Sequence, residues 1–341
     1  MNMSKEVTIY DIAKALNISP ATVSRGLKDH PSLRKDTKKK IQHAAHKMGY
    51  QQNTFASNLR RRHSKTIGVI VPRLDSYFMS AVIAGIEKVA NGTGYNLIIS
   101  QSQESAKKEI ASTKTLFNSR VDGFLISLSS ETKDLDHFDI IFKKRIPLIF
   151  FDRVIEFPHG TNIVINNENA GYDATRHLLD QGCKKVVHVS GSLNRNVYAD
   201  RLKGYKRALA EKRIPFDADL VFENSLTDQA GGNVAQQILK MTKLPDGIFT
   251  ASDTSAVACM RELKQAGVKI PRDIAIVGFN NDPISRVIEP NLSTINYPGN
   301  EMGELAATTL INSLKDPSPG NLNTLIIRHE LIIRPSSLRK K

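Results

Sequence analysis

Several side chains that could bind a polar ligand follow apolar runs of the sequence. Asp152 and Arg153 come directly after "PLIFF" (147–151), and Phe78 lies within "LDSYFMS". A carboxylate beside a guanidinium offers hydrogen-bond acceptors and donors together, which suits a polyol, and an aromatic ring can stack on the apolar face of a sugar ring. Each residue alone is also compatible with a structural salt bridge or a core aromatic. Their convergence in one cleft would make them a binding site.

The apolar runs that would position these residues alternate with helical patterns beyond Lys65. This rhythm predicts an α/β fold with right-handed βαβ units and parallel sheets. Two blocks, near 66–160 and 161–290, with the chain crossing back afterwards, predict two lobes around a cleft, and ligands bind at the carboxyl ends of such strands. The expected strands are 67–71, 95–100, 122–127, 147–151, 185–190, 246–250 and 274–279, and the expected helices of the first block are 78–91, 105–118 and 134–144.

A different pattern comes before Lys65. Apolar residues recur at helical spacing within 9–16, Thr8 and Ser19 are expected N-caps, and a third helical run covers 35–48. Only about three residues separate the first two helices, which is helix-turn-helix spacing. The pattern therefore predicts a DNA-reading module whose second helix enters the major groove, with an ordinary three-helix bundle as the alternative.

The charge is concentrated in the same region. Residues 1–65 contain 14 Lys and Arg against four acidic residues, whereas the remaining 276 contain 34 against 30. A basic head on a nearly neutral body favours a polyanion partner for the head, although a charge run is also compatible with a solvated face. Cys183 and Cys259 have no disulfide or metal-ligand pattern, and no apolar run approaches the length of a membrane span. We therefore expect a cytoplasmic protein without metal or cofactor.

Residues 8–27, "TIYDIAKALNISPATVSRGL", resemble the headpiece of the lac repressor family of bacterial regulators. Members of that family begin T-[IL]-x-D-[IV]-A and continue V/I-S-x-x-T-V-S-R. Residues 48–72, "MGYQQNTFASNLRRRHSKTIGVIVP", resemble the family's G-Y-x-P-N-x-x-A-x-x-L linker and first core strand, with Gln52 in place of the usual proline. The resemblance implies a helix-turn-helix headpiece (1–52), a hinge helix or linker (53–65), and a two-lobed core of the type I periplasmic sugar-binding fold (66–341).

The resemblance also implies roles on DNA. Pro20 and Ala21 occupy the family's variable base-reading pair; Ala21 offers a methyl group suited to thymine, and Arg25 could pair with guanine or contact only phosphate. In the family, leucines of paired hinge helices wedge into the minor groove, and Leu59 holds that position here; an inert basic linker is the alternative. The expected DNA contacts are Thr8, Ser19, Pro20, Ala21, Thr22, Ser24, Arg25, Asn53, Ala56, Leu59 and Arg60.

In the cleft, Arg201 of "RLKGY" matches the family's effector-binding R-x-x-G motif, and Tyr297 stands where several members have glutamine. Asn280 of "GFNNDP" stands where many members have an acidic ligand. We expect this loss of a carboxylate to favour a less polar or an anionic effector, such as a uronic acid or sugar phosphate. The expected effector-binding residues are Phe78, Asp152, Arg153, Arg201, Ser252, Asp253, Asn280 and Tyr297.

Together these features predict a transcriptional regulator, most often a repressor in this family, that binds a palindromic DNA operator as a homodimer under control of a small molecule. No leucine heptad follows Pro335, which favours a dimer over a tetramer. Two alternatives remain: an architectural DNA-binding protein with a vestigial cleft, and a sugar-modifying enzyme with a DNA-binding head. The enzyme is disfavoured because no nucleotide-binding, nucleophile-elbow or zinc-protease motif is present.

Overall fold

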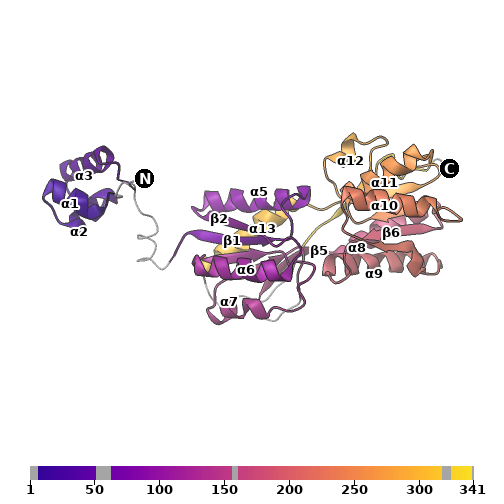
Figure 1. The fold of residues 1–341 in the computed structure, drawn as a ribbon, viewed down its shortest axis with the longest axis horizontal. Coiled ribbons are helices and arrows are strands. Elements are labelled where there is room, and N and C mark those ends of the chain that lie inside the picture. Colours follow the sequence, from indigo (N-terminus) through magenta and orange to yellow (C-terminus); the bar gives the residue numbers. More distant parts are fainter. Residues whose placement is uncertain (1–6, 51–62, 156–159, 317–323, 340–341) are drawn as a thin grey trace, which may run out of the picture. The chain divides into compact units, whose positions relative to one another are not determined.

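The computed structural model describes residues 7–50, 63–155, 160–316 and 324–339. The chain divides into two compact units, Met1–Ser64 and Lys65–Lys341. Figure 1 shows an all-helical first unit and a second unit in which helices cover parallel sheets.

In its described residues, the first unit contains three helices, α1 (Ile9–Leu16), α2 (Pro20–Leu27) and α3 (Lys35–Lys47). Both expected caps are confirmed. Thr8 forms a capping box with Asp11, and the Ser19 hydroxyl accepts a hydrogen bond from the Thr22 amide at 3.1 Å. The apolar faces of the helices meet in a small core of Ile12, Ala13, Val23, Ile41 and Ala45.

In the described residues, the second unit contains two six-stranded sheets, which we call the sheets of the first and second lobes. All strand pairs are parallel except β10 with β12. The first sheet has the order β11 (Thr324–Ile327), β5 (Thr161–Ile165), β4 (Leu148–Phe151), β3 (Gly123–Ile126), β1 (Thr66–Val71) and β2 (Asn96–Gln101). The second has the order β12 (Glu330–Ile332), β10 (Ser293–Asn296), β9 (Ala275–Asn280), β8 (Gly247–Thr250), β6 (Val186–Ser190) and β7 (Val221–Glu223).

Each sheet is buried on both faces because alternate strand residues enter different cores. Ile67, Val69 and Val71 of β1 pack in the core that contains α5 and α13, whereas Ile70 packs in the core of α6 and α7. The helices of the first lobe are α5 (Tyr77–Gly92), α6 (Ala106–Asn118), α7 (Asp139–Lys143) and α13 (Gly299–Lys315), with the 3₁₀ helix η1 (Asp136–Phe138). Those of the second are α8 (Asn167–Asp180), α9 (Asn196–Glu211), α10 (Asp228–Leu239), α11 (Asp253–Gln265) and α12 (Ile284–Val287), with η2 (Ala218–Leu220).

The boundary expected between the two blocks is wrong by one strand. Residues 161–165 form β5, which pairs with β4 of the first lobe through Ile149 and Thr161, so the second lobe begins at α8. The chain later returns to the first lobe as α13 and β11, and Figure 1 shows α13 in late-sequence yellow among the purple elements. A Cβ atom at Gly303 would lie 2.0 Å from the Val82 carbonyl oxygen. Glycine thus lets α13 contact the backbone of α5.

No helix of the described residues is long and apolar enough to cross a membrane. Across the same ranges, no group of three or more His, Cys, Asp or Glu side chains could hold a metal ion. Cys183 and Cys259 are buried free thiols.

Strand β6 of the second lobe contains a buried histidine. His188 of β6 is fully buried, and its ring stacks on Phe249 at a centroid distance of 4.7 Å. Its Nδ1 lies 3.2 Å from the Phe249 carbonyl oxygen, which can only accept, so Nδ1 carries the proton. Nε2 has no hydrogen-bond partner among the described atoms. Burial lowers the pKa of His188 from 6.5 to about 4, so the folded protein holds the neutral ring.

Replacing His188 with phenylalanine should therefore remove a pH dependence from the stability of the second unit. As the pH falls from 6.5 towards 4, His188 becomes protonated in the unfolded chain but stays neutral in the folded one, so the wild type loses stability across that window. Between pH 7 and pH 5, the free energy of unfolding of the wild type should fall by about 2 kcal/mol more than that of the His188→Phe variant. Urea unfolding at both pH values measures this difference. Parallel losses in the two proteins would contradict it.

Candidate functional site

The first unit presents a polar helix end to solvent. Ser19, Ala21 and Arg25 of the α2 region are exposed, and Val23 on the opposite side is buried. Within the described residues no ion pair involves Arg25. The Thr22 and Ser19 hydroxyls lie 2.8 Å apart and share a hydrogen bond. The helix thus exposes one methyl group, one guanidinium and hydroxyl groups, which are the donors and apolar contacts that base edges and phosphates can use.

The rest of the expected DNA-contacting set divides in two. Thr8 lies at the N-terminus of α1 with an exposed side chain, while Pro20 and Ser24 are half-buried on α2. The expected hinge contacts lie outside the described residues, and these are Asn53, Ala56, Leu59 and Arg60.

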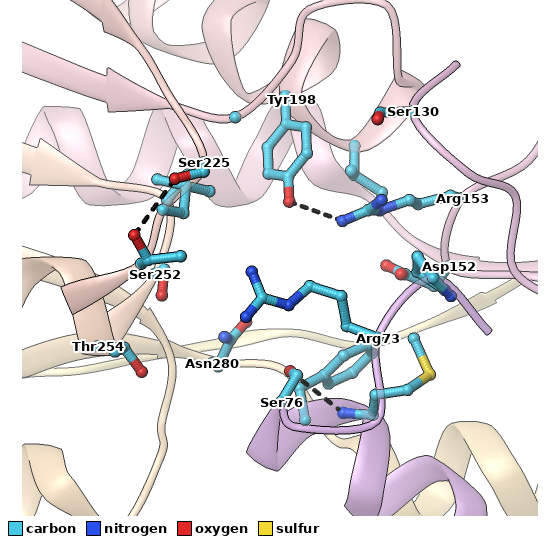
Figure 2. A pocket seen from close by; sticks show the side chains of 18 of the residues that line it. Arg73, Ser76, Ser130, Asp152, Arg153, Tyr198, Ser225, Ser252, Thr254 and Asn280 are labelled. Carbon is cyan, nitrogen blue, oxygen red and sulfur yellow. Dashed lines mark hydrogen bonds between the residues drawn. The ribbon is translucent and has the colours of Figure 1, made fainter. Parts of the chain in front are cut away.

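The second unit contains a cavity of about 510 Å³ lined by residues of both lobes. The lining residues follow the carboxyl ends of strands β1, β2, β3, β4, β6, β7, β8, β9 and β10 or begin the next helix, as expected for a doubly wound sheet. Figure 2 shows Asp152, Arg153 and Ser130 across from Ser252 and Asn280, with Arg73 between them. Seven of the eight expected residues line this cavity: Phe78, Asp152, Arg153, Arg201, Ser252, Asn280 and Tyr297.

Asp152 is the most deeply placed carboxylate of the first-lobe wall, with 5% of the residue exposed. Its Oδ1 accepts a hydrogen bond from the Tyr297 hydroxyl at 2.8 Å, and its Oδ2 accepts one from Ser127 at 3.3 Å. The backbone at Asp152 is left-handed, with φ of 58°, and is held by the Asn196 side-chain amide, which donates to the Asp152 carbonyl at 3.2 Å. Burial raises the pKa of Asp152, although the nearby Arg153 guanidinium opposes this shift.

Arg153 turns towards a partner from another strand end. One guanidinium nitrogen lies 2.8 and 2.7 Å from the two carboxylate oxygens of Glu104, and another donates to the Tyr198 hydroxyl at 3.1 Å. Glu104 in turn accepts from the Ser130 amide at 2.9 Å. The charge of Arg153 is thus already balanced by Glu104. Although Asp152 and Arg153 are adjacent in the sequence, their side chains bind different partners, Tyr297 and Ser127 for Asp152 and Glu104 and Tyr198 for Arg153.

Arg201 is the most buried cation of the lining, with 3% of the residue exposed. Its guanidinium lies 3.5 Å from the centroid of the Phe279 ring, and its Nε donates to Asn167 Oδ1 at 2.9 Å. No carboxylate of the described residues forms a salt bridge with it, and burial lowers its pKa. A buried guanidinium without an ion-pair partner favours a ligand that brings hydrogen-bond acceptors.

Phe78 lines the cavity, but one face of its ring is occupied. Its ring stacks on Tyr297, with centroids 4.2 Å apart and planes inclined by 24°. Because Tyr297 covers this face, a ligand ring could stack only on the other face of Phe78 or after displacing Tyr297. Tyr297 joins the lobes because it follows β10 and packs edge-on against Phe279 in the second lobe, while its ring stacks on Phe78 of α5 and its hydroxyl donates to Asp152 in the first lobe.

Asp253 departs from the expectation, because it is not among the cavity-lining residues. Its Oδ1 accepts from the Thr294 hydroxyl at 2.7 Å, and its Oδ2 accepts from the Asp282 amide at 2.8 Å. Burial and the neighbouring Asp282 raise its pKa well above the ordinary value. Asp253 follows a strand as predicted, but it fastens the loop after β9 instead of facing the cavity.

Several lining residues were missed from the sequence. Arg73, Glu104 and Ser130 follow strands β1, β2 and β3, so the rule that identified Asp152 would have found them. Asp282 also lines the cavity, two residues after Asn280. Although position 280 is an asparagine, this loop therefore still supplies the cavity with one carboxylate, that of Asp282.

Comparisons with known proteins agree with this architecture. The family model for bacterial regulatory proteins of the lacI family matches residues 8–53, and the model for the periplasmic binding protein-like domain matches residues 175–337. The ribose operon repressor of Haemophilus influenzae is 31% identical over 329 residues, which cover 96% of this chain and 98% of that protein.

Two solved structures share the fold. A crystal structure of the lac repressor dimer bound to operator and the anti-inducer ONPF has a TM-score of 0.87 at 23% identity, covering 98% of this chain and 100% of that one. A lacI-family regulator from Enterococcus faecium with bound ribose has a TM-score of 0.72 at 26% identity, covering 81% of this chain and 100% of that one. The expected headpiece and two-lobed core are confirmed, and the chain belongs to the lacI family of bacterial regulatory proteins.

Proposed function

We propose that this regulator represses transcription by binding a palindromic operator as a homodimer, and that a sugar or sugar derivative in the cavity controls this binding. The observation that carries the proposal is the combination, in one chain, of a helix-turn-helix unit and a polar cavity lined by both lobes of a second unit. Relatives named as repressors support it, including the ribose operon repressor of Haemophilus influenzae. A regulator of this kind acts on the chromosome, in the cytoplasm.

On DNA, α2 enters the major groove. Pro20 and Ala21 face the bases at its N-terminus, Arg25 donates to guanine O6 and N7, and the hydroxyl groups of Thr22 and Ser24 contact phosphates. The exposed positions of Ala21 and Arg25 support this assignment. Thr8 and Ser19, at the N-termini of α1 and α2, contact phosphates of the DNA backbone, because the amide groups of a helix N-terminus favour anions.

Residues 53–65 form the hinge in this proposal, between a headpiece of 1–52 and a core of 66–341. We propose that, on DNA, Asn53 caps a short helix and that Ala56 and Leu59 lie on one side of it. Leu59 enters the minor groove as an apolar wedge, while Arg60 neutralises phosphates. A segment of about ten residues is too short to be stable as an isolated helix, so its folding depends on DNA and on the state of the core.

Dimer formation is supported by apolar side chains on the surface of the second unit. Tyr77 at the start of α5 and Ile98 and Ile99 of the edge strand β2 are exposed, as are Ile284 and Val287 of α12, the latter 78% exposed. Burying such residues against a second copy would remove apolar surface from water, and a two-fold dimer would match a palindromic operator.

Replacing Arg25 with alanine should relax the choice of DNA sequence. If Arg25 reads guanine, Arg25→Ala should weaken binding to the preferred site by about 1–3 kcal/mol and remove the preference at one base pair in each half-site. DNA selected from a random library by the wild type and by the variant measures this change. Lys39→Ala, which removes an exposed cation of α3, is the control and should leave the preferred sequence unchanged. An unchanged preferred sequence for Arg25→Ala would contradict a base contact.

Ligand binding in the cavity should depend on Arg201. A sugar at about 100 times its dissociation constant should add about 2.7 kcal/mol to the stability of the folded state and raise the melting temperature. Arg201→Met replaces the guanidinium that lies over the Phe279 ring by an uncharged side chain of similar length, so it should fold while losing most of this ligand shift. Thermal melting with a panel of sugars, uronic acids and sugar phosphates measures both. An undiminished shift in Arg201→Met would contradict the assignment of Arg201. If no compound shifts the wild type, the architectural alternative gains support; turnover of a sugar would favour the enzyme.

A further inference from the structure

The loop after β9 places one carboxylate in the cavity wall without a partner for one of its oxygens. Asp282 lines the cavity and is 6% exposed. Its backbone amide donates to Asp253 Oδ2 at 2.8 Å, which fixes the residue in place. Its own Oδ1 has no hydrogen-bond partner among the described atoms. A buried carboxylate oxygen without a donor is costly, so the site favours a ligand that brings one.

The other carboxylates that line the cavity already have donors. Two of them are salt-bridged to arginines that also line it: Asp75 to Arg73 at 2.9 and 2.7 Å, and Glu104 to Arg153. Asp228 pairs with Arg261 at 3.2 Å on the outer surface. Asp152, as described above, accepts from Tyr297 and Ser127. Asp282 is therefore the lining carboxylate whose hydrogen-bonding capacity remains open in the described part of the cavity.

The charge of the lining also bears on the ligand. Five carboxylates and three guanidinium groups line the cavity, and two of the guanidinium groups are held in ion pairs. Burial raises the pKa of Asp282 to about 6, and this effect is larger than the opposing effect of the hydrogen bond from Asn280. Asp282 is therefore mostly ionised at neutral pH. A carboxylate or phosphate on the ligand would meet this charge in a site with little water to screen it.

We propose that Asp282 determines the specificity of the effector site: it accepts a hydrogen bond from a ligand hydroxyl group and selects a neutral polyhydroxylated ligand over its carboxylate or phosphate counterpart. This inference rests on the proposed function of the cavity as an effector site. Arg201, which lies in the same lobe, supplies hydrogen-bond donors to ligand oxygens. The two side chains together therefore bind a hydroxylated ring, Asp282 as acceptor and Arg201 as donor.

The test uses the full chain and matched pairs of probes. Binding of D-ribose is compared with that of ribose 5-phosphate, and binding of D-glucose with that of glucuronate and glucose 6-phosphate, by calorimetric titration. Asp282→Asn keeps the shape and removes the charge, and Asp282→Ala removes the acceptor. Because Asp282 raises the pKa of Asp253 by like-charge repulsion, Asp282→Asn should not lower the melting temperature. Asp200→Asn is the control, since Asp200 pairs with Lys203 on α9 and is not among the lining residues.

We expect a neutral sugar to bind the wild type at least about tenfold more tightly than its anionic counterpart. Asp282→Asn should weaken binding of the neutral sugar by about tenfold and reduce the ratio between its affinity and that of the anionic counterpart. Asp282→Ala should weaken binding of the neutral sugar further, and Asp200→Asn should leave that binding unchanged. Tighter binding of an anionic probe, or an effect of Asp282→Asn within about twofold, would overturn the role of Asp282 but leave the effector site intact. Failure of every probe to bind would contradict the proposed effector site and, with it, this inference.

Discussion

The structure depends on one buried carboxylate, that of Asp152, and on the need to supply its hydrogen bonds. A charge so far from water is stable only with close partners. Those partners come from different parts of the chain: Ser127 follows β3, Tyr297 follows β10, and Asn196 of α9 holds the Asp152 backbone. Because Asn196 belongs to the second lobe and Tyr297 lies where the chain leaves that lobe, these hydrogen bonds of Asp152 join the two lobes beside the cavity.

This arrangement explains how a small ligand could act on distant residues. A ligand that contacts Arg201 of the second lobe and the neighbourhood of Asp152 in the first binds groups that already connect the lobes. Any difference in its contacts between two lobe arrangements would shift the equilibrium between them. The first core strand, β1, begins at Thr66, directly after the proposed hinge. A movement of the first lobe is therefore transmitted through few residues to the hinge.

The sequence was most informative where local physics decides the structure. The caps at Thr8 and Ser19 and the long apolar strands could be predicted from side-chain chemistry and periodicity. Strands β5, β7, β10, β11 and β12 could not, because polar residues interrupt or flank their short apolar runs and because β11 and β12 depend on tertiary pairing. The strand-end rule located the cavity, but it does not state which way a side chain turns. Asp253 turns to Thr294 and the Asp282 amide, and Asp282 takes the place in the wall.

The central claim is that the cavity and the DNA-binding unit are thermodynamically coupled. The measurement that tests it most directly is the affinity of the full-length protein for a selected operator, by fluorescence anisotropy, with and without a saturating concentration of the sugar that most stabilises the protein. We expect saturating sugar to change the operator affinity by about fivefold or more, and operator to change the sugar affinity by the same factor, because coupling is reciprocal. An operator affinity that stays the same when sugar saturates the cavity would contradict it.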